Sequence, residues 1–283
     1  MDRTVVITGA STGIGRACAL RLDGKGVRVF AGVRDEAAGA ALKADASGRL
    51  VPVAIDVTLP ETVASASRTI ADAVGPQGLA GLVNNAGVFY GGPLELSSLD
   101  ELRRAFDVNV FGTIAVTQAF LPLLRAARGR IVNVSSASGL VALPFYGPYA
   151  ASKFALEAVS DSWRVELRPW GITVVVVEPG VVDTPIGEKA VAVWRDVRDG
   201  ATPEARGLYG PIFDLVEAPY RRGVPADRVA EAVEHALFSR RPRRRYLVGR
   251  DAKTAAVLRR LPARLRDWLI GRRLPSYGGS ARR

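Results

Sequence analysis

Seven short apolar runs, rich in valine and isoleucine, recur along the chain and predict β-strands. Each run is almost continuously hydrophobic, a pattern typical of parallel strands that are covered on both faces. The runs are Thr4–Thr8, Val27–Val33, Leu50–Ile55, Gly81–Asn84, Arg130–Ser135, Ile172–Glu178 and Arg245–Val248. Helix-like stretches separate them, so we expect right-handed crossovers and a doubly wound parallel sheet of about seven strands with helices on both faces.

Two four-residue segments match the capping box, in which a hydroxyl and a carboxylate satisfy free amides at a helix start. They are Thr58-Leu59-Pro60-Glu61 and Ser98-Leu99-Asp100-Glu101. We therefore expect one helix to begin at each segment.

The composition fits a single globular α/β domain in a reducing compartment. The chain has 283 residues, of which 48% are hydrophobic and 24% charged, and its one cysteine, Cys18, rules out an internal disulfide. The start runs directly into a strand and shows no signal peptide. The longest apolar stretch, Ile172–Val177, is far shorter than the ~20 residues of a membrane span. We expect a cytoplasmic protein that is soluble or at most attached to a membrane surface.

The net charge of +11 is concentrated in one segment. From Arg240 to Arg283 there are fifteen basic and two acidic residues, a net +13, which leaves −2 for residues 1–239. We predict a catalytic domain over residues 1–250 and a basic, amphipathic C-terminal extension over residues 251–283.

A glycine-rich segment follows the first predicted strand and precedes the helical stretch Arg16–Leu22. Its sequence is Thr8-Gly9-Ala10-Ser11-Thr12-Gly13-Ile14-Gly15. Glycines at such a bend let the backbone approach a pyrophosphate closely, and the helix start offers free amides to the anion. Glycines also serve ordinary turns, but this position between strand and helix favours dinucleotide binding.

The spacing G-x-x-x-G-x-G resembles that of the short-chain dehydrogenase/reductase family, and further motifs follow in the family's order. They are Asn84-Asn85-Ala86-Gly87, Asn109 within Asp107–Gly112, Ser135-Ser136, Tyr149-Ala150-Ala151-Ser152-Lys153, and Pro179-Gly180 with Thr184. The resemblance covers residues 4 to about 185 and extends more loosely to Val248. It implies a Rossmann-type fold and an NAD(P)-dependent oxidoreductase that interconverts an alcohol and a ketone or aldehyde.

Tyr149 and Lys153 are four residues apart in a helical stretch, so both point to the same side. A neighbouring ammonium stabilises a phenolate and so equips tyrosine for proton transfer at neutral pH. The resemblance implies that Tyr149 is the general acid/base and that Lys153 binds the nicotinamide ribose and tunes Tyr149. It also implies that Ser136 hydrogen-bonds the substrate oxygen and that Asn109 holds a water linking Lys153 to solvent.

Two neighbouring residues compete for these roles. Ser135 is the rival of Ser136, which has the better spacing from Tyr149. Tyr146 is the rival tyrosine, but Ala150 lies four residues on, where the motif requires lysine. We therefore interpret Tyr146 as a pocket wall.

The resemblance also implies a set of cofactor-binding residues, with Asp56 as the adenine contact. The set is Gly9, Ser11, Thr12, Gly13, Ile14, Gly15, Arg34, Asp56, Val57, Asn85, Ala86, Gly87, Tyr149, Lys153, Pro179, Gly180, Val182 and Thr184.

The end of the second strand favours NADP(H) over NAD(H). An acidic residue there binds a free 2′-hydroxyl, whereas an arginine favours the 2′-phosphate. Val33 stands at the family's usual acidic position and Arg34 follows it. Asp35 and Glu36 come next and would weaken this preference, so NAD(H) stays an alternative.

The segment from Thr184 to Arg222 is far longer than an ordinary connection. It carries four aromatic residues, Trp194, Tyr209, Phe213 and Tyr220. One interpretation is a lid of one or two helices over an apolar pocket, near Phe89, Tyr90, Phe145 and Tyr146. The other is that these rings pack a small core of the lid's own. The lid and the segment Phe30–Arg34 resemble those of the hydroxysteroid and retinol dehydrogenase branch of the family. This resemblance implies a bulky lipophilic substrate.

Apolar residues recur at helical spacing in the basic extension. They are Val257, Leu258, Leu261, Leu265, Trp268 and Leu269. We expect this stripe to pack on the body while the arginines stay solvated; the alternative is contact with a membrane interface. Pro262 would kink the helix. The arginines from Arg240 to Arg245 come without a nucleic-acid-binding fold, so no nucleic-acid partner is expected.

No cluster of ligand-type residues at metal spacing occurs, and His235 is interpreted as an ordinary helix-side histidine. A non-catalytic sensor or scaffold on the same fold is the alternative function, and sugar epimerase or dehydratase chemistry is a third. By resemblance we expect a homodimer or homotetramer that pairs through the helical stretches from Leu99 and from Tyr149.

Overall fold

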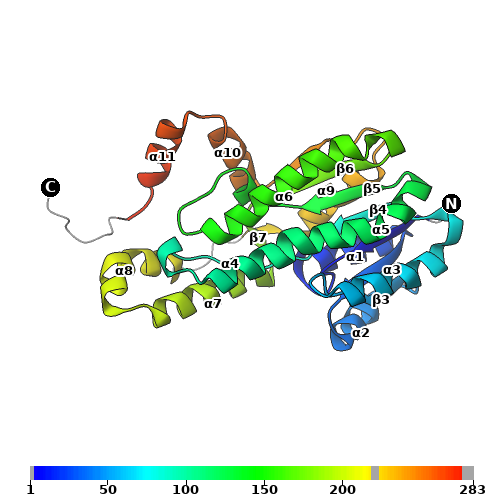
Figure 1. Ribbon diagram of the computed structural model, residues 1–283, viewed down its shortest axis with the longest axis horizontal. Helices are drawn as coiled ribbons and strands as arrows, with labels where there is room; N and C mark the ends of the chain where they lie inside the picture. The colour runs from blue at the N-terminus through cyan, green and yellow to red at the C-terminus, as the bar shows by residue number, and fades with distance from the viewer. Residues whose placement is uncertain (1–2, 218–222, 276–283) are drawn as a thin grey trace.

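The computed structural model describes residues 3–217 and 223–275, and its centre is one parallel sheet of seven strands. The strands stand in the order β3-β2-β1-β4-β5-β6-β9 (Figure 1). Their bounds are β1 Thr4–Ile7, β2 Arg28–Val33, β3 Leu50–Ala54, β4 Gly81–Asn84, β5 Arg130–Val134, β6 Thr173–Pro179 and β9 Arg245–Val248. All seven predicted strands are confirmed to within one residue at each end.

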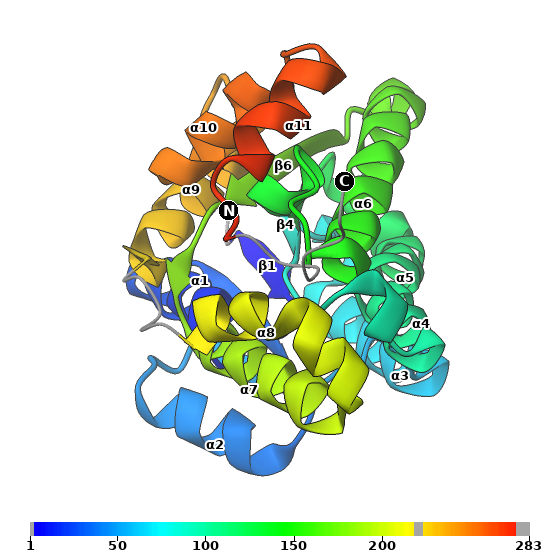
Figure 2. The same ribbon diagram turned by 90° about the vertical axis from the view of Figure 1, so that its left-hand side faces the viewer.

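Helices cover both faces of the sheet, which confirms the doubly wound, Rossmann-type fold. One face carries α1 Gly13–Gly24, α2 Glu36–Ala44 and α9 Ala226–Phe238; the other carries α3 Pro60–Val74, α5 Thr113–Ala127 and α6 Gly147–Glu166. Figure 2 shows α1 and α9 on one side of the sheet and α3, α5 and α6 on the other. Strand residues such as Val5 and Val6 point alternately into the two apolar layers, so each strand is covered twice.

One of the two predicted capping boxes is correct. At Ser98 the side chain caps α4 (Leu99–Phe106), and Glu101 accepts a hydrogen bond from the Ser98 amide. At Thr58 the prediction is wrong, because α3 begins at Pro60 with Leu59 as its N-cap. The Thr58 hydroxyl instead donates to Asp56 Oδ1, 2.7 Å away. The Thr58 amide donates to the same oxygen at 2.9 Å, so Thr58 belongs to a turn with Asp56 that ends before the helix begins.

Helix α4 continues through a π-helical segment, η3 (Asp107–Gly112), into α5. By length and composition alone, the run Leu99–Ala127 would pass for a membrane span. However, Val116, Phe120 and Leu124 are completely buried in the layer next to the sheet. The run therefore occupies the position of a core helix.

The long segment after β6 forms two helices, α7 Pro185–Gly200 and α8 Pro203–Glu217. Two short strands, β7 Val182–Asp183 and β8 Val224–Pro225, pair in parallel at its base. The predicted pair of helices is confirmed, and their role as a lid stays a prediction; Tyr220 lies outside the described residues.

The basic extension forms α10 Arg250–Leu258 and α11 Ala263–Gly271. Pro262 is the N-cap of α11, so the expected kink is a complete break between two helices. Figure 1 shows α7, α8, α10 and α11 gathered at one end of the molecule.

Candidate active site

The carboxyl ends of six neighbouring strands meet at one edge of the sheet, and the predicted site residues follow them. Gly9–Gly15 follow β1, Arg34 follows β2, Asp56 and Val57 follow β3, Asn85–Gly87 follow β4, Ser136 follows β5, and Pro179 and Gly180 end β6. The strand order reverses between β1 and β4, the kind of position where open α/β sheets bind their ligands.

The phosphate loop is shaped by three glycines. Gly9 (φ +63°) and Gly13 (φ +55°) adopt left-handed backbone, which favours glycine. A Cβ at Gly15 would overlap the carbonyl oxygen of Gly9. Thr12 is the N-cap of α1, and its side chain makes no capping hydrogen bond. The first amides of α1 are therefore open to an anion, and this cradle fits the pyrophosphate of a dinucleotide.

Asn85 ties the phosphate loop to the end of β4. Its side-chain amide donates to the carbonyl oxygens of Thr8 and Gly9, each at 3.0 Å. In return, the Thr8 hydroxyl accepts from the amides of Asn85 and Ala86 at 3.0 and 3.1 Å. These bonds fix the two loops on either side of the switch point.

The adenosine end of the predicted site lies at β2 and β3. Arg34 is exposed, while the Asp35 carboxylate caps α2 by accepting from the Ala38 amide at 2.7 Å. Burial acts to raise the pKa of Asp56, but hydrogen bonds from Thr58 and the charge of Arg34 outweigh it and hold that pKa below its usual value. Asp56 therefore stays ionised, as an acceptor for an adenine amino group requires.

Lys153 reaches the end of β5 from the first half of α6. Its ammonium donates to the carbonyl oxygen of Val134 at 3.0 Å and lies 5.7 Å from the centre of the Tyr149 ring. The predicted common face of these two side chains is thereby confirmed. Burial lowers the pKa of Lys153 to about 8, and the nearby Glu157 carboxylate partly offsets this.

Asn109 lies in the π-helical turn and braces the same region. Its side-chain oxygen accepts from the Val88 amide at 2.8 Å, and its amide donates to the Ser152 hydroxyl at 2.9 Å. Ser152 in turn donates to the backbone carbonyl of Tyr149 at 2.8 Å. The sequence placed Ser152 inside the tyrosine motif without a role, and the structure shows it linking Asn109 to the tyrosine turn.

Gly87 lies between Asn109 and Lys153. A Cβ at this position would stand 3.3 Å from Asn109 Oδ1 and 3.8 Å from Lys153 Nζ. The missing side chain leaves a small space beside the ammonium, which suits the ribose hydroxyls that the family resemblance assigns to Lys153. The water that Asn109 is expected to hold stays a prediction.

The two serines at the end of β5 differ in their surroundings. Ser136 is the N-cap of the short helix η4 (Ala137–Gly139) and accepts from the Ser138 amide at 3.1 Å. Its own hydroxyl hydrogen is thus left to donate to a substrate oxygen. The Ser135 hydroxyl is buried beside Gly139 and, within the described residues, has no hydrogen-bond partner. This environment supports Ser136 over Ser135 for the substrate contact.

Tyr146 belongs to an aromatic cluster that joins the site to the lid. Its ring centre lies 5.5 Å from that of Phe89 and 6.4 Å from that of Trp194 on α7. Phe145 contacts Trp194 and Tyr209, with both ring centres at 6.3 Å. Burial raises the pKa of the Tyr146 phenol, which suits a pocket wall and not a proton donor. The lid aromatics therefore pack a shared core with residues from the site.

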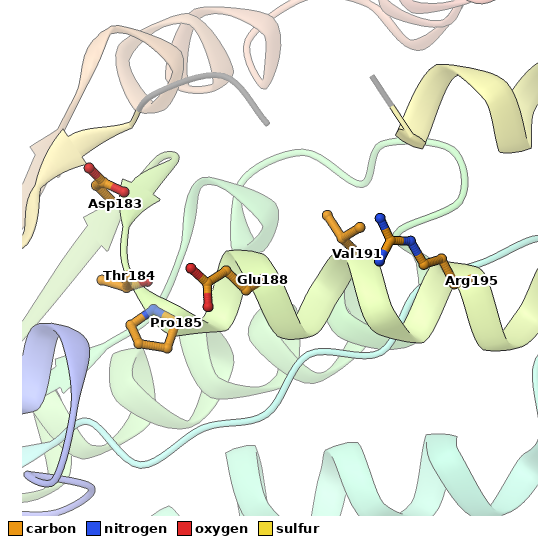
Figure 3. A pocket seen from close by; sticks show the side chains of 6 residues that line it. All are labelled: Asp183, Thr184, Pro185, Glu188, Val191 and Arg195. Atoms are coloured by element: carbon orange, nitrogen blue, oxygen red, sulfur yellow. The ribbon is translucent and has the colours of Figure 1, made fainter. Parts of the chain in front are cut away.

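A cavity of about 570 Å³ begins beside the phosphate loop and follows α7 (Figure 3). Thr184 is one of its lining residues and lies 3.2 Å from where a Cβ on Gly13 would be. Glu188, Val191 and Arg195 line it along one side of α7, as Figure 3 shows. The cavity therefore lies along α7, and its Thr184 end is next to the phosphate loop.

Sequence reasoning missed a partly buried ion cluster one helical turn beyond Lys153. Arg245 on β9 pairs with Glu157 on α6, with Glu178 on β6 at 2.6 Å, and with Asp161 at 2.8 Å. Burial and the Glu157 charge raise the pKa of the fully buried Glu178, although Arg245 opposes them. These residues carry no motif, and they meet only because β9 pairs with β6.

Within residues 3–217 and 223–275 no group of three or more metal-ligand residues occurs. His235 Nδ1 lies 2.7 Å from the Tyr246 hydroxyl, which matches the expected helix-side role.

The family model described as "short chain dehydrogenase" matches residues 3–193. Retinol dehydrogenase 16 of Homo sapiens is 39% identical over 89% of this chain and 82% of its own length. 17-beta-hydroxysteroid dehydrogenase type 6 of Bos taurus is 38% identical over 97% of this chain and 89% of its own length. Among solved structures, a short-chain dehydrogenase from Burkholderia cenocepacia J2315 in complex with NADP superposes with a TM-score of 0.75 at 28% identity, covering 97% of this chain and 98% of that one.

Proposed function

We propose that this chain, which belongs to the short-chain dehydrogenase family, interconverts a bulky lipophilic alcohol and its ketone or aldehyde with NADP(H). Family membership makes it an oxidoreductase that acts on CH–OH groups with a nicotinamide cofactor. The proposal adds the identity of the cofactor and the class of substrate.

The observation that carries the chemistry is the position of Lys153. Its buried ammonium is fixed to Val134 on the Tyr149 side of α6 and stabilises the phenolate form of that tyrosine. When bound, the nicotinamide supplies or accepts the hydride. Tyr149 gives its hydroxyl proton to the developing alkoxide in reduction and takes it back in oxidation, while the Ser136 hydroxyl donates to the same oxygen.

Arg34 supports NADP(H). The residue before it, Val33, offers no carboxylate, and Asp35 is engaged as the cap of α2. Asp35 is one of the two acidic residues expected to oppose a 2′-phosphate, and its carboxylate already accepts a hydrogen bond from the Ala38 amide. Because an arginine–phosphate contact is a charge-assisted hydrogen bond, Arg34→Ala should lower the preference for NADPH over NADH roughly 10- to 100-fold.

The lid supports a large apolar substrate. The aromatic residues Phe89, Phe145, Tyr146, Trp194 and Tyr209 pack in one core, and the Phe89 ring centre lies 5.1 Å from that of Tyr149. We infer that movement of α7 and α8 opens a volume lined by these rings. Two of the relatives are named for retinol and for a 17-beta-hydroxysteroid, and both of these are bulky lipophilic alcohols. We therefore assign retinoid- or steroid-like alcohols to this chain.

The test is a screen of the purified protein against steroid, retinoid, long-chain and small aromatic ketones, with NADPH and NADH followed in parallel. We expect turnover of a bulky lipophilic ketone with NADPH, and loss of turnover in Tyr149→Phe with NADPH affinity retained. Tyr149→Phe turning over near the wild-type rate would refute the assigned mechanism. Tight NADPH binding without any turnover would favour the sensor alternative, which no finding so far supports.

We also propose a cytoplasmic homo-oligomer. Three large apolar side chains, Phe111, Phe154 and Val165, are exposed on the η3–α5 and α6 helices at 59%, 41% and 73%. These are the helical stretches that the family resemblance assigns to pairing. Light scattering after size exclusion should show a dimer or tetramer, and Val165→Arg should shift it towards the monomer.

A further inference from the structure

The two helices of the basic extension expose large apolar side chains. Val257 on α10 is 62% exposed, and Leu265 and Trp268 on α11 are 44% and 54% exposed. Helix α11 has no fully buried residue, and its apolar residues Leu269 and Ile270 are only half-buried. The expectation that this stripe packs on the body is therefore wrong for Leu265 and Trp268, while Leu269 is half-buried.

The exposed Leu265 and Trp268 share one face of α11 with the half-buried Leu269. Residues at spacings of three and four share a helix face, so Leu265, Trp268 and Leu269 lie together. Arg264 and Arg266 fall on either side of this face at the helical period of 3.6 residues. The Arg272 guanidinium stacks on the Trp268 ring, 4.7 Å from its centre. An apolar face with a basic rim on both sides is the arrangement of a helix that lies in a membrane interface.

The charge of this region is strongly positive. Residues 250–273 contain eight basic and two acidic residues. Seven of the eight basic residues are exposed, and Arg266 is half-buried beside Asp267. Both acidic residues already have partners in the described chain: Asp267 pairs with Arg266, and Asp251 accepts a hydrogen bond from the Val181 amide. The surface is thus complementary to an anionic one.

The extension is anchored to the active-site end of the molecule. Asp251 at the start of α10 binds the Val181 amide, directly after the Pro179-Gly180 turn. Helix α10 also packs against η4, the turn that follows Ser136. Figure 2 shows α10 and α11 beside the same end of the sheet as the lid helices α7 and α8. Whatever α11 binds therefore lies near the mouth of the site.

We propose that α10 and α11 dock the protein on an anionic lipid bilayer, with Val257, Leu265 and Trp268 entering the interface and the arginines contacting lipid phosphates. The active-site end then faces the bilayer. If the proposed function holds, a lipophilic substrate enters the site from the bilayer. A second copy of the chain is disfavoured as the occupant, because a two-fold contact through this face would bring two net-positive surfaces together.

The direct test is co-sedimentation of the purified full chain with vesicles of phosphatidylcholine alone and with 30% phosphatidylglycerol at physiological salt. We expect binding to the mixed vesicles only. Trp268→Ser and Leu265→Ser should each weaken it about tenfold through lost apolar burial. Arg259→Gln and Arg260→Gln should each cost roughly fivefold, since an arginine near an anionic surface contributes about that factor.

Trp170→Ser is the matched control. Trp170 is 48% exposed and carries Arg125 on its ring at 4.6 Å, so it repeats the Trp268–Arg272 pair away from the extension. Its substitution should leave vesicle binding unchanged. Absence of wild-type binding to the mixed vesicles, or equal losses in Trp170→Ser and Trp268→Ser, would overturn the proposal. So would a dimer that becomes a monomer in Trp268→Ser without any vesicle binding.

The docking surface and the substrate class can fail separately. Vesicle binding requires no turnover, so binding without activity on any lipophilic ketone would uphold the docking surface and refute the substrate class. Conversely, Trp268→Ser should keep the wild-type rate on a water-soluble ketone. A lost rate there would place Trp268 in the site itself and contradict the assignment to a membrane.

Discussion

The Lys153 ammonium donates a hydrogen bond to the backbone carbonyl of Val134, 3.0 Å away, and so ties helix α6 to the end of strand β5. This one contact sets where the positive charge stands relative to Tyr149 and to the two serines that follow Val134. Because the carbonyl belongs to the backbone, no substitution at position 134 except one that moves the strand would remove it.

The burial of Lys153 predicts a pH-dependent cost to stability. Its pKa falls to about 8 in the folded protein, chiefly through burial, against 10.5 when unperturbed. The unfolded chain therefore binds more protons between these values, and stability rises with pH there. Relative to Lys153→Met, the wild type should gain about 2 kcal/mol of unfolding free energy between pH 7.5 and pH 9.5. Urea unfolding of both proteins measures this, and an equal difference at the two pH values would contradict it.

Glu157 is expected to extend the pH range in which Lys153 stays charged. Its carboxylate acts to raise the pKa of Lys153. In the pH–rate profile of alcohol oxidation, Glu157→Gln should therefore move the alkaline limb to lower pH. Asp161→Asn is the control, since Asp161 also binds Arg245 but lies one turn further from Lys153. If both variants shift the limb equally, the effect comes from a disturbed ion cluster and not from the charge of Glu157.

The phosphate loop predicts opposite effects for two glycine substitutions in α1. A Cβ at Gly15 would overlap the Gly9 carbonyl and the Asn85 amide, so Gly15→Ala should displace the loop and reduce NADPH affinity at least tenfold. Gly24 ends the same helix with nothing within 4 Å of its Cβ position. Gly24→Ala should leave affinity unchanged and raise stability by roughly 0.5–1 kcal/mol. Fluorescence titration and thermal unfolding compare the two; an unaffected Gly15→Ala would mean the loop is looser than described.

Trp194 is expected to hold the lid closed. It is 4% exposed and packs against Phe145 and Tyr146. Trp194→Ala should remove about 3–5 kcal/mol of stabilising free energy from the aromatic cluster. We expect it to destabilise α7 and α8 more than the sheet. Limited proteolysis should cleave within residues 185–217 much faster, while the main thermal transition moves little. A large drop in the main transition with unchanged cleavage would show that the lid and the sheet unfold together.

The linear order of residues determined the strands, the glycine loop and the common face of Tyr149 and Lys153. Each depends on neighbours within a few positions: a buried parallel strand needs a continuous apolar run, a tight turn needs glycine, and a spacing of four fixes a helix face. The charge of the C-terminal extension is likewise a property of composition alone.

Only the tertiary structure decided what these elements meet. Pairing of β9 with β6 brings Arg245 to Glu157 and Glu178, and the end of β5 supplies the Val134 carbonyl to Lys153. Thr58 turns to Asp56 instead of capping α3, and Trp268 stays exposed although its stripe is typical of a packed helix. A local pattern records which face of an element is apolar or charged. Which partner that face meets depends on the packing of elements far apart in the chain, and no short window contains that information.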